Sequence, residues 1–595
     1  MAEQPRYLIT TPDERTWYFD KPVVFLGEWC RLHERQEVWG NIDAKVVPPY
    51  GWKEGQKEAD FSYVQSLYEQ LLVELSEALN QFHGTNHSLR YWRILIGPWL
   101  HTFTNILFNR WKTIQLAMWE FAIAGTVVLE FPVEQMIPNS VNEFERNHVC
   151  HQWNHHIFGR ILSGWTSVPC ERIAAHVLTQ NYIAPPTNGR RLRRVMAKWL
   201  YAFSRLLSCP TDAFLINSYL PHKQDFLLQL ALGQIPKLWR TEAEPKIAPN
   251  LKTREQFRLA DERHKGFEQC IRTLIVEQIP VLYLEGYQAL NRAVSNVPWP
   301  SHPKVIFTSN SAHGDEIFKS WTAGKTELGT PYVISQHGGL YGTGKYPNQF
   351  EIREVVTVDR YLTWGWTDNN PKHYPCVALK LIGQSIGSWN PDGGLLQVTM
   401  LNLRYTRDPW DIAGQQAEYQ EEQFRFVAKL PEFIQSELIV RLSRAAKSHG
   451  YPRDEIWKLR HPNVRLDFGC SSIEALIRRS RLFVYTYNST GFLETLGRNI
   501  PTIIFWNPKH WELRPSAQRY FDRLKQVGIL HDTPESAANK VASVWDNVEA
   551  WWSQTDVQEA RVYFRDRFAR IPENPIFELK VALQSVISNG SVNVE

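Results

Sequence analysis

Cysteine is scarce in this chain, and neither sign of charge is in excess. Seven cysteines are scattered over 595 residues without a CxxC pair. An odd, irregularly spaced set argues against a secreted disulfide scaffold and suits a reducing compartment. The formal charge of only +4 at pH 7 gives no support for a nucleic-acid-binding protein.

Long apolar runs are also missing. The best candidate, residues 116–131, is too short to cross a bilayer and contains Glu120 and Glu130. The first residues lack the charged-then-apolar design of a secretory signal. These absences lead us to expect a cytoplasmic protein.

The chain instead shows a repeated strand–helix alternation, which is typical of α/β proteins with parallel sheets. Its length predicts more than one core. We expect two Rossmann-like domains, residues 1–375 and 376–530, followed by a helical tail over 531–595 that packs back on both. Helices without clear strands over about 135–260 indicate a helical insertion in the first domain. Expected strands include 7–10, 22–27, 93–98, 304–309, 332–335 and 360–364, then 398–401, 437–440, 464–468, 482–485 and 502–505.

A polar turn between the last two of these strands carries the strongest functional signal. Asn488, Ser489, Thr490 and Gly491 follow a buried strand and open a helix. Open α/β sheets bind ligands at this position, where free N–H groups and the helix dipole favour an anion. Serine and threonine also cap ordinary helices, which is the plainer interpretation. The repeated pattern in the neighbouring segments favours a phosphate site.

Three segments resemble known transferases. They are Gln336-His-Gly-Gly339, Ser471-Ser-Ile-Glu-Ala-Leu476 and Asn488-Ser-Thr-Gly-Phe-Leu-Glu-Thr-Leu496. The first resembles the His-Gly turn of capsule and teichoic-acid polymerases. The last resembles the donor-phosphate turn of GT-B sialyl- and Kdo-type transferases, which use CMP-linked acidic sugars. The whole chain, beginning with Arg6-Tyr-Leu-Ile-Thr-Thr-Pro-Asp-Glu-Arg-Thr-Trp17, is similar to a bacterial family of transferases at O-antigen loci.

The resemblance implies a GT-B glycosyltransferase of lipopolysaccharide or other surface-polysaccharide biosynthesis. Its nucleotide-sugar donor would bind the C-terminal half through Asn488, Ser489, Thr490 and Gly491, with Glu494 on the ribose and Arg441 or Arg404 neutralising phosphate charge. The CMP-sugar enzymes carry a Lys-x-His-Pro-like turn where this chain has Arg441-Leu-Ser-Arg444, which keeps other nucleotides open. Nothing resembles an Asp-x-Asp metal site, so we expect neither a metal ion nor a cofactor.

Such a transferase needs a base for the acceptor hydroxyl, facing the donor from the N-terminal half. His337, Asp13 and Glu14 follow predicted strands there and are the candidates. Gln336, Gly338 and Gly339 would line the acceptor site. His337 and Asp13 also have plainer interpretations. His337 can shape a glycine turn, and Asp13 can cap a loop beside Arg15.

Two further groups carry weaker signals. His148, His151 and His155 share one predicted helical face, which suits a polar surface better than a metal site without a matching carboxylate or cysteine pair. Residues 190–206 form a basic amphipathic segment, either a solvated face or a peripheral contact with the inner membrane, where lipid-linked glycan acceptors lie.

Other functions remain open at this point. A polyol-phosphate transferase of the teichoic-acid type would need a second histidine in the C-terminal half, for which His461 is the close candidate. A non-catalytic nucleotide- or sugar-binding protein and a nucleotide-sugar epimerase would keep the same fold.

Overall fold

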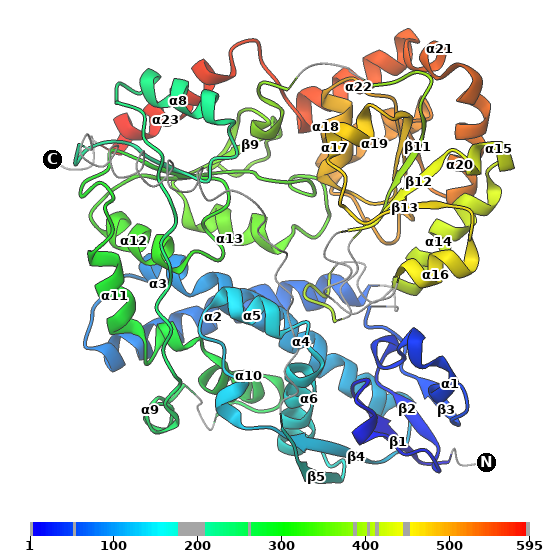
Figure 1. Ribbon diagram of the computed structural model, residues 1–595. Helices are drawn as coiled ribbons and strands as arrows, with labels where there is room; N and C mark the ends of the chain where they lie inside the picture. Colours follow the sequence, from blue (N-terminus) through cyan, green and yellow to red (C-terminus); the bar gives the residue numbers. More distant parts are fainter. Residues whose placement is uncertain are drawn as a thin grey trace, which may run out of the picture.

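The computed structural model describes residues 4–51, 55–176, 209–259, 263–384, 389–400, 405–410, 416–443 and 453–590. Within these residues the chain forms three all-parallel sheets surrounded by helices (Figure 1). The α/β class with parallel sheets is therefore confirmed. The expected first domain, however, contains two separate sheets, and the second domain contains the third.

The first sheet has the order β3-β2-β1-β4-β5. Its strands are β1 (Arg6–Ile9), β2 (Val23–Phe25), β3 (Ala44–Val46), β4 (Ile123–Glu130) and β5 (Cys170–Ala174). The surrounding helices are α2 (Gln56–His83), α3 (Leu89–Leu95), α4 (Gly97–Glu120), α5 (Val141–Asn147) and α6 (His151–Trp165). Leucines of α2 at the spacing of helix turns, from Leu67 to Leu79, are buried against this core, as the sequence predicts.

The second sheet has the order β10-β9-β8-β7-β6. Its strands are β6 (Phe214–Ile216), β7 (Ile306–Thr308), β8 (Tyr332–Ser335), β9 (Arg360–Thr363) and β10 (His373–Pro375). The helices along this part of the chain are α8 (His222–Ala231), α9 (Leu251–Gln256), α10 (Phe267–Gln278), α11 (Tyr287–Ser295), α12 (Glu316–Glu327) and α13 (Gln349–Thr357). Strands β6, β7 and β8 are buried on both faces, as is typical of parallel sheets.

The third sheet has the order β13-β12-β11-β14-β15-β16. Its strands are β11 (Gly394–Val398), β12 (Leu438–Arg441), β13 (Arg465–Asp467), β14 (Ser480–Tyr485), β15 (Thr502–Phe505) and β16 (Leu530–His531). Its helices include α14 (Gln416–Lys429), α15 (Glu432–Gln435), α16 (Arg453–Arg460), α17 (Ile473–Ile477), α18 (Thr490–Gly497) and α19 (Pro515–Gln526). The strand order reverses between β11 and β14, and such switch points are the usual ligand sites of open sheets.

The C-terminal residues are helical and contact both halves. They form α20 (Pro534–Val544), α21 (Val548–Trp552), α22 (Thr555–Phe568) and α23 (Pro575–Gly590). Phe564 of α22 packs on Phe492 and Phe521 of the third-sheet region. Leu579 and Leu583 of α23 are buried in one cluster with β6 and β7.

Three local expectations were wrong. Residues 93–98 are helical, because Ser88 caps α3 and Pro98 occupies the first turn of α4; a short apolar run does not distinguish a buried helix from a strand. The region 135–260 contains strands β5 and β6 as well as helices. The first strand of the third sheet, β11, lies at Gly394–Val398, earlier than 398–401.

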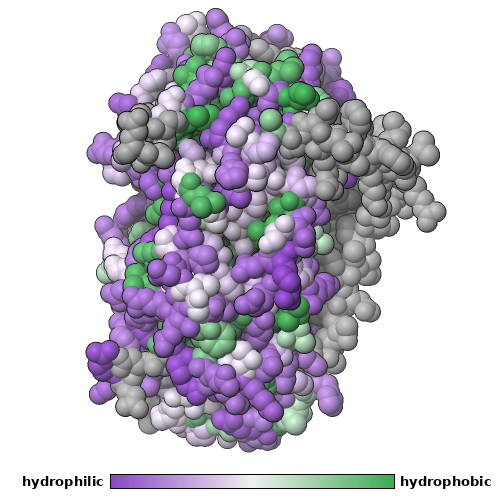
Figure 2. All heavy atoms as spheres, turned by 90° about the vertical axis from the view of Figure 1, so that its left-hand side faces the viewer, coloured by the Kyte–Doolittle hydropathy of each residue, from purple (hydrophilic) through white to green (hydrophobic). Residues whose placement is uncertain are grey.

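Hydrophilic residues predominate on the face shown in Figure 2, where apolar residues form separate small patches. Within the described residues, no helix is both long enough and apolar enough to cross a membrane.

Candidate functional site

The loops after β8 and β14 touch each other. The backbone N–H of Gly339 donates a hydrogen bond to the hydroxyl oxygen of Thr490 over 2.7 Å. A Cβ at Gly339 would lie 2.6 Å from the Thr490 nitrogen, so only glycine permits this approach. The Gln336–Gly339 turn and the Asn488–Gly491 turn, identified separately in the sequence, therefore form one junction.

Gln336 holds the first turn from inside. It is 1% exposed, and its amide nitrogen donates to the Gly338 carbonyl over 2.8 Å. Its amide oxygen accepts hydrogen bonds from the Trp364 backbone N–H and the Trp366 indole. The amide of Gln336 is thus engaged within the protein, whereas Gly338 and Gly339 lie against Thr490.

A cleft of about 450 Å³ opens where β6, β7 and β8 end. Its lining includes Asn217, Asn310, Ser311, His313, Asp315 and His337, each of which follows one of these three strands. Glu242, Glu244 and Phe350 close it from other segments. The cleft is therefore at the carboxyl edge of a parallel sheet, where α/β proteins place their ligands.

His337 is held in an uncharged form within this cleft. Burial, together with the positive charge of Lys380, lowers the pKa of His337 to about 3. Its ring lies 3.0 Å from the Tyr341 hydroxyl and 3.5 Å from a carboxylate oxygen of Glu354 on α13. Burial raises the pKa of Glu354 to about 8, so it is protonated at pH 7. His337 is consequently a weak base with fixed neighbours.

Asp315 is a functional candidate that the sequence analysis missed. One of its oxygens caps α12 by accepting from the Phe318 N–H over 3.0 Å. The other, Oδ2, is buried without a hydrogen-bond partner among the described residues. Burial raises the pKa of Asp315 to about 6, closer to a working pH than that of His337. Its position in the loop between β7 and α12, immediately before the helix, was the available signal.

Three residues near the cleft have a left-handed backbone. Asn217 and Tyr219 follow β6 with φ values of 47° and 62°, and Leu340 follows the glycine turn with φ of 72°. Such conformations are costly outside glycine and gather at functional sites. The amide of Asn217 donates to Ser311 over 2.7 Å, which ties two loops of the cleft together.

Asp13 and Glu14 lie elsewhere, in the loop after β1 of the first sheet, and do not line this cleft. Arg15 donates to both oxygens of Asp13, and Arg35 donates to both oxygens of Glu14. Burial would raise the pKa of Asp13, but the hydrogen bonds and charge of Arg15 outweigh it and lower that pKa. A carboxylate held in this way is a poor base at neutral pH.

The three predicted histidines have separate partners. His148 pairs with Glu145, His151 contacts the Tyr405 hydroxyl, and His155 lies 3.1 Å from the Thr10 hydroxyl. No group of three metal-ligating side chains that could hold an ion occurs among the described residues.

Of the predicted donor-binding residues, Asn488 and Ser489 are buried at the junction. The Asn488 amide donates to the Thr343 hydroxyl over 3.0 Å, and its carbonyl oxygen has no hydrogen-bond partner in the described part of the chain. The Ser489 hydroxyl is buried without a well-formed hydrogen bond, although the Tyr487 hydroxyl lies near it. Ser489 also precedes α18 without capping it by its side chain. Both side chains therefore retain capacity for a ligand.

The other donor-side candidates are more dispersed. Arg441 ends β12 and donates to the Ser471 carbonyl. Its guanidinium also lies 3.6 Å from a carboxylate oxygen of Asp467. Burial raises the pKa of Glu494 on α18, and Lys380 lies near enough to oppose that effect. A side chain at Gly491 would collide with the Tyr485 ring, so close packing alone explains why glycine occupies this position. Arg404 and residues 190–206 lie outside the described residues.

These features define a class: an α/β protein whose polar sites lie at the carboxyl ends of parallel strands and meet at a glycine turn. Residues 6–583 match the family described as LIC12162 family transferase, and the chain belongs to that family. It is therefore a transferase. No curated protein matches the chain.

Several solved glycosyltransferases show distant similarity. The chain is 14% identical to SnogD from Streptomyces nogalater, covering 63% of this chain and 99% of that one, with a TM-score of 0.33. It is 11% identical to UGT71G1 from Medicago truncatula, solved with UDP-glucose, covering 66% and 94% with a TM-score of 0.32. The chain is 10% identical to MurG of Acinetobacter baumannii, covering 67% of this chain and 97% of that one, with a TM-score of 0.29. TM-scores of this size do not establish a common fold.

Proposed function

We propose that this transferase is a GT-B glycosyltransferase that moves a nucleotide-activated sugar to a glycan acceptor. The observation that carries the proposal is the junction of Gly339 with Thr490, which unites the cleft after β6–β8 with the polar turn before α18. The acceptor occupies the cleft, and the donor phosphate lies beside Asn488 and Ser489. Water is excluded at the junction, so that the acceptor hydroxyl outcompetes hydrolysis.

In this proposal Asp315 is the base that takes the proton of the acceptor hydroxyl. Its raised pKa and free oxygen suit that role better than the depressed pKa of His337. His337, uncharged and fixed by Tyr341, orients the acceptor through a hydrogen bond. Asp13 and Glu14 have no part in the proposed reaction. Asp315 takes the role of base for which the sequence had suggested them.

The leaving phosphate is stabilised by groups fixed before the reaction begins. The Ser489 hydroxyl, the N-terminus of α18 and the Arg441 guanidinium are the proposed groups, acting without a metal ion. Glu494 binds the ribose. Preorganised groups of this kind usually supply the largest catalytic effect, about 3 kcal/mol for each one removed.

For the donor, a CMP-linked acidic sugar is our first choice, and the acceptor is a glycan of O-antigen or another surface polysaccharide. The supporting observation is the motif from Asn488 to Leu496, whose turn remains the site of unsatisfied polar atoms. Arg441 in place of the expected lysine and histidine turn leaves UDP, GDP and dTDP sugars as the main competitors.

Thermal stabilisation by CMP, CDP, UDP, GDP and dTDP tests the proposal, with S489A as the variant and S553A on the exposed surface as its control. A shift with CMP that S489A alone loses supports the acidic-sugar donor. A shift with UDP, GDP or dTDP retains the glycosyltransferase and rejects CMP. No shift with any nucleotide rejects nucleotide-sugar transfer in favour of a binding protein.

A polyol-phosphate transferase is the second candidate, because it would use a histidine on each side of the junction. His461 packs against Phe424 and Trp457 instead. His510, however, lines a small cavity together with Asn488 and Leu340, and its Nδ1 is buried without a partner in the described residues. Incubation with a CDP-polyol and with a CMP-sugar distinguishes the two functions: release of CMP from the CDP-polyol alone, lost in H510Q, would favour the second.

A further inference from the structure

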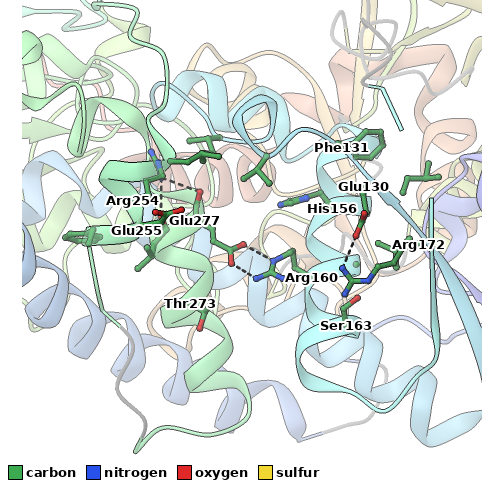
Figure 3. Close-up of a pocket in the computed structure, with 18 of the residues that line it drawn as sticks. Glu130, Phe131, His156, Arg160, Ser163, Arg172, Arg254, Glu255, Thr273 and Glu277 are labelled. Atoms are coloured by element: carbon green, nitrogen blue, oxygen red, sulfur yellow. Dashed lines mark hydrogen bonds and ion pairs between the residues drawn. The ribbon is translucent and has the colours of Figure 1, made fainter. Parts of the chain in front are cut away.

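A second, larger cavity lies apart from the cleft, between the C-terminal end of β4 and helices α6, α9 and α10 (Figure 3). Its volume is about 690 Å³, which is within the range of small-molecule sites. Most of its wall is apolar, formed by residues such as Leu129, Phe131, Ile137, Phe257, Leu259 and Val276. None of its lining residues also lines the cleft. A wall of this composition favours a hydrocarbon occupant.

Among the described residues, one buried side-chain polar atom in the wall lacks a hydrogen-bond partner. His156 on α6 is 8% exposed, and its Nε2 has no hydrogen-bond partner within the described residues. Figure 3 shows its ring projecting into the cavity. The preceding residue, His155, differs because its Nε2 accepts the Leu129 backbone N–H over 2.8 Å. Buried polar atoms are nearly always satisfied, so the free nitrogen of His156 indicates a ligand atom.

The charges around the cavity leave little attraction for an ion. Arg160 is paired with Glu277, Arg172 with Glu130 and Arg254 with Glu285. The two remaining charged lining residues, Glu255 and Arg258, are exposed and of opposite sign. Burial also lowers the pKa of His156 to about 4, so its ring is neutral. A buried charge on the ligand would therefore be uncompensated and unfavourable.

We propose that this cavity binds the hydrocarbon chain of an uncharged amphiphile (a long-chain alcohol, a prenol or an acyl ester) whose oxygen forms a hydrogen bond with Nε2 of His156. The apolar wall suits the hydrocarbon chain of the ligand, and the unpartnered nitrogen suits one oxygen atom at its polar end. The paired arginines and glutamates account for the absence of charge at the buried end.

The cavity and the cleft share two chain segments. In one segment Ile137 lines the cavity and Asn142 lines the cleft. In the other, Leu251 lines the cavity and Glu244 lines the cleft. Seven residues of fully extended chain span at most about 25 Å, which limits the separation of the two sites. Resting on the proposed function, the hydrocarbon chain and the glycan are then two parts of one lipid-linked acceptor.

Displacement of the neutral fluorescent dye N-phenyl-1-naphthylamine from the full chain, without nucleotide, tests the proposal. The competitors are 1-dodecanol, dodecanoate and dodecylammonium, each below its aggregation concentration. Dodecanol should displace the dye at one site, and both ions should bind at least about tenfold more weakly. Because no donor is present, the result is independent of glycosyl transfer.

Two variants locate the site. V276W fills the cavity and should abolish dye binding, whereas V73W, on the exposed face of α2, should leave it unchanged. H156F keeps an apolar ring, so it should retain dye binding while weakening dodecanol about fivefold. If V276W fails to fold, H156F decides alone. Unchanged dye binding in a folded V276W, unchanged dodecanol affinity in H156F, or equal affinity for dodecanoate would overturn the proposal.

Discussion

Gly339 and Thr490 are 151 residues apart in the chain, yet the N–H of one donates to the hydroxyl oxygen of the other over 2.7 Å. This contact joins the carboxyl edge of the second sheet to that of the third. Every proposed role at the site depends on this junction, because it fixes the proposed acceptor cleft relative to the proposed donor turn.

Substitution G339A should therefore separate the two turns. A methyl group there would lie 2.4 Å from the Ser489 carbonyl carbon and 2.6 Å from the Thr490 nitrogen, so the Ser489–Thr490 backbone leaves it no space. We expect a loss of about 1–3 kcal/mol in the free energy of unfolding and a larger proportional loss of transfer activity. Chemical denaturation and a transfer assay measure both quantities.

Gly324 supplies the control for that experiment. It lies within α12, and a Cβ there would meet nothing within 4 Å. Substitution G324A should leave activity unchanged and stabilise the helix by up to about 1 kcal/mol. Similar effects of the two substitutions would contradict the role of the junction.

Substitution D315N should reduce kcat by about 10²–10⁴-fold while preserving the cap of α12, since asparagine caps as well as aspartate. In the unaltered protein kcat/KM should rise with pH through about 6, as Asp315 loses its proton. The variant should lack this rise. The control is D225N, which alters a carboxylate outside the cleft whose pKa burial also raises.

The free energy of unfolding should change with pH in the direction opposite to kcat/KM. The pKa of Asp315 is about 6 when folded, above its ordinary value of 3.8, so protonation favours the folded state. That contribution is complete below about pH 4 and lost as pH rises through 6, which amounts to about 3 kcal/mol. At pH 7 the D315N variant should therefore be more stable than the unaltered protein in urea titration. A less stable D315N would contradict the assigned pKa.

Glu354 should make the stability of the protein fall as pH rises toward 8. Burial raises its pKa from 4.5 to about 8, so the contribution of its protonated form is complete below about pH 4.5 and lost as pH rises through 8. The free energy of unfolding should fall by about 1 kcal/mol per pH unit between these two values and level off above pH 8. Substitution E354Q retains an acceptor for the Tyr361 hydroxyl and should flatten this dependence. The control, E432Q on the exposed surface, should not.

Arg514 ties the third-sheet region to α13. Its guanidinium donates to Glu351 over 2.8 Å and to the Gly344 carbonyl over 3.1 Å, and both side chains of the ion pair are largely buried. Substitution R514M should cost about 3 kcal/mol, because it leaves Glu351 buried without its charge partner.

The double variant R514M/E351Q should lose less than the sum of its two single substitutions, because the uncompensated charge is then absent. R523M in α19, the helix that begins directly after Arg514, removes an exposed pair with Glu559 and should cost below about 1 kcal/mol. Strict additivity in the double variant would show that the ion pair does not couple the two regions.

The sequence by itself determined the order of elements and the location of the polar turns. Strands 332–335 and 502–505 occur where their β-branched and aromatic runs predict them, and α18 begins at Thr490 directly after Ser489. These features are local, since residue type and spacing over a few positions set the backbone conformation. The match to the transferase family likewise comes from the sequence, over residues 6–583.

Only the tertiary structure decided which of these pieces meet. It separated the first 174 residues into their own sheet, placed Asp13 beside Arg15 outside the cleft, and brought Asp315 into it. It also turned residues 93–98 into helix, because a run that is apolar on every side can be buried in either form. Burial and long-range contact set the pKa values of Asp315, His337 and Glu354, and neither quantity can be read from a few neighbouring residues.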